Sequence, residues 1–386
     1  MLEEWFRQLV SCEKRGVGFD LLRLILRGVS ILYGVVVWVR NFLYDHGLLK
    51  IHKSDIPVIS VGNLTLGGTG KSPMVAWLCE YFISQDLRPA IISSGYRHKN
   101  TNKIDNVSKV NDEYLELAFR LPDVYHFQNR DRVAAIRELL EFVLRQSCSN
   151  IQEVEHGKAT SRILGIDLVV LDDGMQHRRL RRDFEIVLLD AMEPFGYGYM
   201  FPRGMLRESV YGLRRADVVL LSRADLISAA ERGRIEEFVR GIAPKAIFAE
   251  IVHSPEKIIY ANGEEAAVKS IRGKNIFAFC GIGNPNAFRS TLTNNSDGQI
   301  HFEQYPDHHG YTKNDVIEIV QKALLLGVDL VLCTMKDFVK ISSILKSETD
   351  PNFIKLFSNI PLAALTIQIN FLTNESPLKK SLNKIF

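Results

Sequence analysis

The stretch from Pro57 to Phe82 constrains the fold most, because it has the pattern of a strand, a glycine-rich loop and a helix in immediate succession. Val58 to Val61 is a short apolar run rich in β-branched residues, which is typical of a buried parallel strand. The segment GGTGKS follows at residues 67–72, and apolar residues then recur at helical spacing up to Phe82. A phosphate-binding motif is credible only in this context.

The residues of the loop have the chemistry that a polyphosphate requires. Its glycines let the backbone approach an anion, and the following helix presents its positive dipole end. Lys71 supplies a mobile cation, and the Ser72 hydroxyl is placed for Mg²⁺. Thr65 stands where the G-x-x-x-x-G-K-[ST] spacing has its first glycine. A glycine-rich turn without a ligand is the simpler alternative, but the context favours a nucleoside triphosphate. The predicted nucleotide-binding residues are Thr65, Leu66, Gly67, Gly68, Thr69, Gly70, Lys71 and Ser72.

A second motif is the apolar strand that ends in Asp172 and Asp173, within GIDLVVLDDG at residues 165–174. An acidic pair at this place has the Walker-B arrangement, which delivers a carboxylate beside the phosphate loop to hold Mg²⁺. Two acids at the end of a strand also occur in simple turns, so this motif depends on the first one. Gln176 and His177 follow on the same loop.

Composition limits the class of protein. The chain has 386 residues, of which 46% are hydrophobic, so it can bury a sizeable core. A net charge of +3 is too small to imply nucleic-acid binding. The five cysteines are dispersed and form no CxxC pair, which favours a reducing compartment and neither a disulfide framework nor a zinc site.

Strands that alternate with helices predict an α/β fold, a P-loop NTPase-like parallel sheet flanked by helices. We expect three regions: an N-terminal membrane-associated helical region over 1–50, a P-loop core over 51–250, and a hinge with a smaller C-terminal α/β subdomain over 251–386. The strand rhythm weakens around 247–262, where the hinge is expected. Gly281-x-Gly283 is too short for a dinucleotide fingerprint, so no Rossmann cofactor is predicted.

Residues 19–43 form an apolar segment flanked by arginines. Its uninterrupted part, between Arg27 and Arg40, spans only ~18 Å as a helix at about 1.5 Å per residue. A hydrocarbon core is roughly 30 Å thick, so a clean crossing is not expected. The segment indicates a helix lying in or dipping into a membrane face. The alternative is a buried helix of a soluble core.

Two further groups have the residue types of a catalytic base. Asp112 and Glu113 open a segment of helical spacing, where carboxylates also serve as simple cap residues. Asp307 and His308 are adjacent, and a carboxylate beside an imidazole can make a general base, although such a pair is more often structural.

Taken together and in this order, the motifs resemble the tetraacyldisaccharide 4'-kinase family, whose members phosphorylate a disaccharide lipid precursor in the lipid A pathway. The resemblance covers nearly the whole chain, and the family shares the threonine at Thr65. The matching segments are 61–73, Ser94-Gly95-Tyr96, Asp112-Glu113, Asp172 to His177, Phe201-Pro202-x-Gly204, Leu206-Arg207-Glu208, Gly281 to Pro285, Asp307-His308 and Thr334-x-Lys336-Asp337.

The resemblance implies the roles of the site residues. Asp112 and His308 would form the dyad that deprotonates the sugar hydroxyl, coming from different domains so that closure of a cleft completes the site. Lys71 and Asp173 complete the expected catalytic set. ATP and Mg²⁺ are the implied cofactors. The implied metal ligands are Ser72, Glu113, Asp172, Asp173 and Gln176.

The resemblance also implies the substrate and the location. The acceptor would be the 4'-hydroxyl of a tetraacylated glucosamine disaccharide 1-phosphate, and the product lipid IVA. The chain would act at the cytoplasmic face of the inner membrane of a Gram-negative-type bacterium, peripherally or monotopically, with neither nucleic acid nor an obligate protein partner. Departures from the family pattern concern loops near the acceptor. They are Asn111 and Tyr114 in place of Gly and Pro, Arg97-His98-Lys99 in place of further glycines, and Arg203 in place of a small residue.

Two other functions remain open from the sequence. The loop resembles part of that in partitioning and septum-positioning ATPases, which act as membrane-targeting switches, but those proteins have a lysine where this chain has Leu66. The third possibility is a degenerate family member that binds nucleotide and has lost its acceptor.

Overall fold

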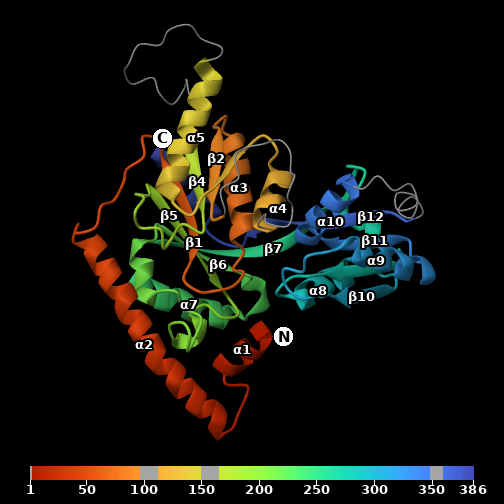
Figure 1. The fold of residues 1–386 in the computed structure, drawn as a ribbon, viewed down its shortest axis with the longest axis horizontal. Coiled ribbons are helices and arrows are strands. Elements are labelled where there is room, and N and C mark those ends of the chain that lie inside the picture. The colour runs from red at the N-terminus through yellow and green to blue at the C-terminus, as the bar shows by residue number, and fades with distance from the viewer. Residues whose placement is uncertain (1, 96–111, 149–164, 348–359) are drawn as a thin grey trace. The chain divides into compact units, whose positions relative to one another are not determined.

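The computed structural model describes residues 2–95, 112–148, 165–347 and 360–386. The chain forms two compact units (Figure 1). The first comprises Met1–Asn100, Asp123–Val252 and Ile369–Phe386, and the second comprises Thr101–Pro122 and His253–Gln368. This division differs from the expected three regions: residues 1–50 lie within the first unit, the described residues 112–122 belong to the second unit, and 369–386 belong to the first. Arg97, His98, Lys99 and Asn111 lie outside the described residues.

The first unit contains the predicted parallel sheet with flanking helices. Its strand order is β7-β6-β5-β1-β4-β2-β3, and every one of these neighbouring pairs is parallel. The strands are β1 (Val58–Asn63), β2 (Pro89–Ser93), β3 (Tyr125–Gln128), β4 (Leu168–Asp172), β5 (Phe184–Asp190), β6 (Val218–Ser222) and the first part of β7 (Ile247–Tyr260). Strands β1, β2, β4 and β6 are buried throughout, as continuous apolar runs in a covered parallel sheet should be.

Helices cover this sheet and build two apolar clusters. One cluster joins β2 and β4 to α5, and the other joins β5 and β6 to α7. In Figure 1, α3 and α5 lie along the strands of this unit. The helices of the first unit are α1 (Leu2–Val10), α2 (Val17–Asp45), α3 (Lys71–Ile83), α5 (Arg132–Cys148), α7 (Ala229–Ile242) and α12 (Glu375–Leu382). Short 3₁₀ turns are η2 (Gly196–Gly198), η3 (Val210–Arg215), η4 (Ala224–Leu226) and η6 (Asn383–Ile385).

Helix α2 is the long helix at the margin of the first unit in Figure 1. Most of its large apolar side chains are exposed, among them Leu32 (69%) and Trp38 (64%), while its buried residues are Arg23, Ser30 and Val37. It is long and apolar enough to cross a membrane by length and composition. The alternative of a buried core helix is therefore wrong, since a core helix would hide these side chains.

Helix α1 is held by one of the residues that depart from the family pattern. The Arg203 side chain is buried, and its Nη1 donates to the Val10 carbonyl oxygen at 3.0 Å. The guanidinium also lies over the Tyr199 ring, 4.4 Å from its centroid. Arg203 thus fastens the N-terminal helix to the loop after η2.

The second unit is a smaller sheet with strand order β10-β9-β11-β12-β7, and β8 pairs antiparallel with the second part of β7. Its further strands are β8 (Glu265–Ala267), β9 (Ile276–Cys280), β10 (Ile300–Gln304), β11 (Leu330–Thr334) and β12 (Leu362–Phe371). Its helices are α4 (Asp112–Arg120), α8 (Pro285–Asn295), α9 (Lys313–Leu325), α10 (Met335–Ser347) and the turn η5 (Val268–Ile271). Residues 247–262, expected to form a hinge, are mostly strand β7, whose largely half-buried side chains weaken the sequence rhythm.

Candidate active site

The phosphate loop lies between the end of β1 at Asn63 and the start of α3 at Lys71. Gly67 and Gly70 have φ angles of 107° and 91°, which side chains with a Cβ rarely adopt. Gly70 is the residue that precedes α3, so the left-handed turn directs the chain into the helix and places the helix N-terminus at the loop. The sequence-predicted loop residues 65–72 are thus contiguous at a positive helix end, which suits a phosphate anion.

The acidic pair lies beside the strand that leads into this loop. Asp172 ends β4 and is aligned with Val61 of β1. The turn after β4 packs so closely on β1 that a Cβ on Gly174 would lie 2.3 Å from Ser60 Oγ. A Cβ on Gly62 would lie 2.5 Å from Met175 Cβ. Both glycines are therefore required by the close approach of these segments.

Asp173 is the centre of a charged cluster. Its Oδ1 lies 2.6 Å from an Arg207 Nη1 and 3.7 Å from Lys71 Nζ. Both cations also reach Asn63 Oδ1, each at 3.3 Å. Burial raises the pKa of Asp173, but Lys71 and Arg207 outweigh it and hold the pKa below its ordinary value. The carboxylate is therefore ionised at neutral pH.

The segment after η2 contributes Arg207, which the sequence placed in a motif but not among the expected site residues. Its backbone is paired with the phosphate loop, because Arg207 N donates to the Leu64 carbonyl at 2.7 Å and Leu66 N donates to the Met205 carbonyl at 2.8 Å. The Tyr33 hydroxyl of α2 donates to the Arg207 carbonyl at 2.9 Å. The segment that contains Arg207 is thus held between α2 and the phosphate loop.

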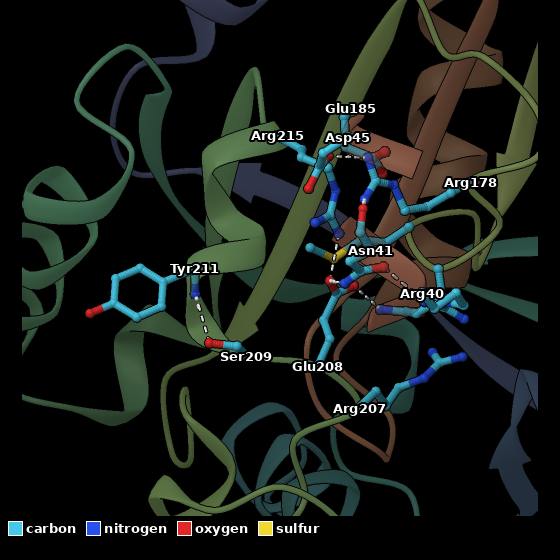
Figure 2. A network of polar contacts seen from close by, with 12 residues as sticks. Arg40, Asn41, Asp45, Arg178, Glu185, Arg207, Glu208, Ser209, Tyr211 and Arg215 are labelled. Carbon is cyan, nitrogen blue, oxygen red and sulfur yellow. Dashed lines mark hydrogen bonds and ion pairs between the residues drawn. The ribbon is translucent and has the colours of Figure 1, made fainter. Parts of the chain in front are cut away.

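Figure 2 shows a polar network around Glu208, whose side chain is buried. Its Oε2 accepts from Arg215 Nη2 at 2.6 Å and from Asn41 Nδ2 of α2 at 3.3 Å. Its Oε1 accepts from Gln176 Nε2 at 2.9 Å. The same Gln176 nitrogen donates to the Asn63 carbonyl at 3.0 Å, whereas Gln176 Oε1 is buried and accepts no hydrogen bond within the described residues. An oxygen in this state is suited to a cation.

The predicted magnesium ligands divide between the two units. Ser72, Asp172, Asp173 and Gln176 belong to the first unit, and Glu113 belongs to the second. Hydroxyl, carboxylate and amide oxygens suit Mg²⁺, and the orphaned Gln176 oxygen fits that chemistry. In the described part of the chain, no cluster of three or more His, Cys, Asp or Glu side chains is placed to hold a metal ion. A magnesium ion here would therefore complete its shell with phosphate oxygens and waters, as Mg²⁺ usually does.

A cationic cavity of about 200 Å³, which no sequence motif predicts, lies beside the proposed metal ligand Gln176. Arg132 of α5 is 2% exposed, and its Nε and Nη2 have no hydrogen-bond partner within the described residues. Burial and Arg132 lower the pKa of the neighbouring His177 to about 4, so this imidazole is neutral at pH 7. The cavity is lined by Arg40, Tyr44, Arg130, Asp131, Arg132, Val133, Gln176, His177, Arg178, Arg179 and Leu180.

Two of these arginines pair with carboxylates of the first unit. Arg178 pairs with Asp45 at 2.5 Å, visible in Figure 2, and Arg179 pairs with Asp131 at 3.1 Å. Five arginines against one lining carboxylate leave an excess of positive charge, which favours an anionic ligand. In the sequence, arginines recur at 130–132 and at 178–182. They indicate a shared anion site only once the fold places the start of α5 next to the turn after β4.

The second unit holds the Asp–His pair that the resemblance implied. Asp112 is the first residue of α4, and its Oδ2 lies 2.9 Å from His308 Nδ1. The hydrogen bond to Asp112 raises the pKa of His308 above its ordinary value. Burial raises the pKa of Asp112, but the hydrogen bonds from His308 and Lys340 lower it further than burial raises it. The expectation that the two residues come from different domains is wrong, because Asp112 and His308 both belong to the second unit.

Close packing around Gly281 positions His308. The His308 amide donates to the Gly281 carbonyl at 3.2 Å, and His308 has φ 56°, which is uncommon for a residue with a side chain. A Cβ on Gly281 would lie 3.0 Å from the Pro306 carbonyl oxygen and 3.3 Å from Asp337 Oδ1. The glycine of this motif is therefore explained by packing against the 306–309 turn.

Known proteins resemble this chain in both sequence and structure. A family model described as Tetraacyldisaccharide-1-P 4'-kinase matches residues 22–386. A tetraacyldisaccharide 4'-kinase of Chlorobium luteolum is 31% identical over 379 residues, covering 94% of this chain and 98% of that protein. One of Syntrophus aciditrophicus is 33% identical over 351 residues, covering 86% and 88%.

A solved structure shares the fold. The crystal structure of LpxK from Aquifex aeolicus in complex with ATP superposes with a TM-score of 0.68 at 26% sequence identity, covering 95% of this chain and 99% of that one. On the evidence of sequence and fold, the chain belongs to the tetraacyldisaccharide-1-P 4'-kinase family.

Proposed function

We propose that this protein transfers the γ-phosphoryl group of ATP to the 4'-hydroxyl of a tetraacylated glucosamine disaccharide 1-phosphate, giving lipid IVA. The observation that carries the proposal is the 2.9 Å contact between His308 Nδ1 and Asp112 Oδ2 in a chain that also has a phosphate loop. A phosphate loop alone would serve an ATPase switch equally well. A prepared base is needed only where an acceptor hydroxyl must lose its proton.

The phosphate loop and its helix would bind the nucleotide. The loop amides and the N-terminus of α3 would receive the phosphates, and Lys71 would move from Asn63 and Asp173 towards the transferred group. Bound Mg²⁺, held by Ser72, Asp172, Asp173 and Gln176, would supply charge neutralisation on the phosphate oxygens. Asp173 is already ionised by its two cationic neighbours and so is ready to act as a ligand.

The dyad would remove the proton of the acceptor. Because Nδ1 of His308 faces Asp112, the nitrogen left for the hydroxyl is Nε2, which lies 4.0 Å from Asp307 Oδ2. With the proton on Nδ1 directed at the carboxylate, the imidazole accepts the hydroxyl proton at Nε2 as the oxygen attacks phosphorus. Asp112 then stabilises the imidazolium that forms.

The arginine cavity offers a place for the phosphate that the acceptor already carries. That group is a dianion near neutral pH, and guanidinium groups bind such oxygens in a planar, bidentate way. Arg132 is buried, and two of its nitrogens have no hydrogen-bond partner within the described residues. A phosphate in the cavity would accept hydrogen bonds from them. We assign the cavity to the 1-phosphate end of the lipid.

Helix α2 supports a place at a membrane. Its exposed apolar side chains would lie among acyl chains, where the proposed substrate also resides, and Trp38 suits the interface. We propose that the protein acts at the cytoplasmic face of the inner membrane. Neither nucleic acid nor an obligate protein partner enters the proposal.

The test is transfer of labelled γ-phosphate from ATP to a tetraacyl disaccharide monophosphate in detergent micelles, with Lys71→Ala as control. We expect labelled lipid with the natural protein and none with the variant. An Arg132→Met arm should raise the KM for the lipid and leave the KM for ATP unchanged, and Arg181→Met, an exposed arginine nearby, is its matched control. ATP hydrolysis with nucleotide-dependent dimerisation and no labelled lipid would instead support a switch.

A further inference from the structure

A third side chain shares the carboxylate of the Asp–His pair. Lys340 Nζ lies 2.7 Å from Asp112 Oδ2, the oxygen that also accepts from His308 Nδ1 at 2.9 Å. The same ammonium group donates to the His309 carbonyl oxygen at 3.0 Å. Lys340 therefore connects the carboxylate to the backbone of the residue that follows His308.

The ammonium group is fixed in place by burial. Lys340 is 7% exposed, which is unusual for a lysine because burying its charge is costly unless it is paired. A buried lysine that meets both a carboxylate and a carbonyl has little freedom to move. Surface ion pairs, in contrast, give up side-chain entropy for a small gain.

The helix that carries Lys340 is also fastened to the His308 turn. Asp337, one turn earlier on α10, is fully buried and accepts from the Gly281 amide at 3.1 Å, the Thr334 hydroxyl at 2.6 Å and the Tyr311 hydroxyl at 3.1 Å. Since Asp337 and Lys340 are three residues apart, they lie on one face of the helix. That face is thereby aligned with the turn that presents His308.

Helix α4, which begins at Asp112, packs against the same helix. Figure 1 shows α4 and α10 as neighbours, and the Phe119 and Phe338 rings meet edge to face with centroids 5.9 Å apart. Leu115 of α4 joins the apolar cluster that contains Phe338. The carboxylate and the ammonium group thus sit on two packed helices whose separation is set by the core.

We propose that Lys340 is a positioning residue for the phosphoryl transfer, acting on His308 through Asp112. The proposal rests on the function proposed above. The carboxyl torsion of an aspartate is broad, so one hydrogen bond to an imidazole leaves its plane loosely defined. A second, charged donor at a fixed point selects one orientation, and the His308 ring is then held with Nε2 available to the acceptor hydroxyl.

The charges around the pair are consistent with this role. Asp307 and Lys336 also act electrostatically on His308, so the imidazole stands among two carboxylates and two ammonium groups. Lys340 differs from Lys336 in that its Nζ directly contacts Asp112 Oδ2, the oxygen that accepts from His308, at 2.7 Å. The sequence did not reveal it, because Lys340 follows the Thr334-x-Lys336-Asp337 motif by one turn and looks like an ordinary helical lysine.

The first experiment compares three variants in the labelled-phosphate assay on the full chain. Lys340→Met keeps the volume and loses the charge and the donor. We expect kcat to fall roughly 10- to 100-fold, the usual effect of losing a hydrogen bond to a charged group, with the KM for ATP unchanged. Lys340→Arg should recover at least part of kcat, and Lys340→Gln, which can still donate to His309 but has no charge, should not.

A double-mutant cycle shows whether the effect passes through Asp112. If it does, Asp112→Asn with Lys340→Met should be no slower than Asp112→Asn alone, because the second change has nothing left to position. Lys322→Met is the matched control, since Lys322 is also a lysine of the second unit that pairs with two carboxylates, Glu303 and Glu318. Its kcat should equal that of the natural protein.

Distinct outcomes overturn distinct claims. Natural kcat in Lys340→Met, or additive losses in the double variant, would refute the positioning role while the kinase proposal stands. If the natural protein labels no lipid, the function itself is wrong. Lys340→Met could fail to fold, which loss of its cooperative melting transition would reveal. In that case Lys340→Arg and Lys340→Gln test the proposal instead. Equal kcat in those two variants would refute the role of the charge.

Discussion

The proposed base depends on one contact between two ordinary side chains, His308 and Asp112. Their hydrogen bond raises the pKa of His308, and a base must be neutral to accept a proton, so turnover should be lost as pH falls through that raised pKa. Asp112→Asn removes the carboxylate charge, and the acid limb of the kcat/KM profile should then move to lower pH while kcat drops sharply.

The measurement is kcat/KM against pH for both proteins, with ATP affinity followed by calorimetry. ATP binding should survive in Asp112→Asn, because Asp112 belongs to the second unit and the phosphate loop to the first. An acid limb at the same pH in both proteins would mean that His308 is not the group that titrates. Full activity in Asp112→Asn or in His308→Ala would refute the dyad.

At this scale the sequence predicts local chemistry and misses long-range partners. Lys71 and Asp173 follow from motifs a few residues long, and the structure places them 3.7 Å apart. Arg132 and Lys340 carry no motif of their own. Arg132 acquires its meaning from a cavity whose lining comes from α2, α5 and the turn after β4, and Lys340 from a helix more than 200 residues from Asp112.

Among the elements, α2 exposes large apolar side chains to a degree that water alone does not explain. Replacing Leu24, Leu32 and Val36 together by Gln should release the protein from vesicles of anionic phospholipid, because these exposed side chains are the ones that acyl chains would cover. Since they are 64%, 69% and 67% exposed, thermal stability should change little. The measurement is cosedimentation with vesicles, alongside a melting curve.

The matched control is Leu325→Gln on α9, an equally apolar residue that is 88% exposed. It should leave vesicle binding intact. If the triple variant still sediments with vesicles, or if removal of the first 45 residues does not abolish binding, another surface anchors the protein. The sequence predicts the membrane role of α2 from its apolar run, but its exposure depends on which neighbours pack against it.

For the whole molecule, alternating strands and helices predict the parallel sheet with flanking helices, and this is confirmed. The division of the chain is harder to predict, because it depends on contacts between segments far apart in the sequence. The described part of 101–122 joins the second unit through Leu115 and the α10 helix, and 369–386 returns to the first unit. Neither segment has a composition that reveals its partner.

The return of the chain to the first unit can be tested through Leu378 of α12, which is fully buried. Nearby, the Trp77 and Phe371 rings lie 5.0 Å apart, and the Tyr81 hydroxyl donates to Asn383 Oδ1 at 2.6 Å. Leu378→Ala should lower the free energy of unfolding by about 2–5 kcal/mol, as removal of a buried leucine side chain usually does.

Chemical denaturation of the full chain gives this value, with ATP added in a parallel series. Because α12 packs in the nucleotide-binding unit, the stabilisation by ATP should restore part of the loss. Leu326→Ala, at a half-exposed leucine of the second unit, should change the free energy far less. An equal loss in both variants would show that α12 contributes nothing particular to the first unit.

The same return has a consequence for synthesis on the ribosome. Strand β7 leaves the first unit at Val252, and the chain re-enters it only at Ile369, near its end. The segments that make the second unit have therefore all been translated before α12 exists. Domains generally fold as they emerge, so here the smaller unit can be finished while the nucleotide-binding unit still lacks its last helix. A nascent chain stalled before residue 369 would contain both residues of the proposed base and an incomplete nucleotide-binding unit.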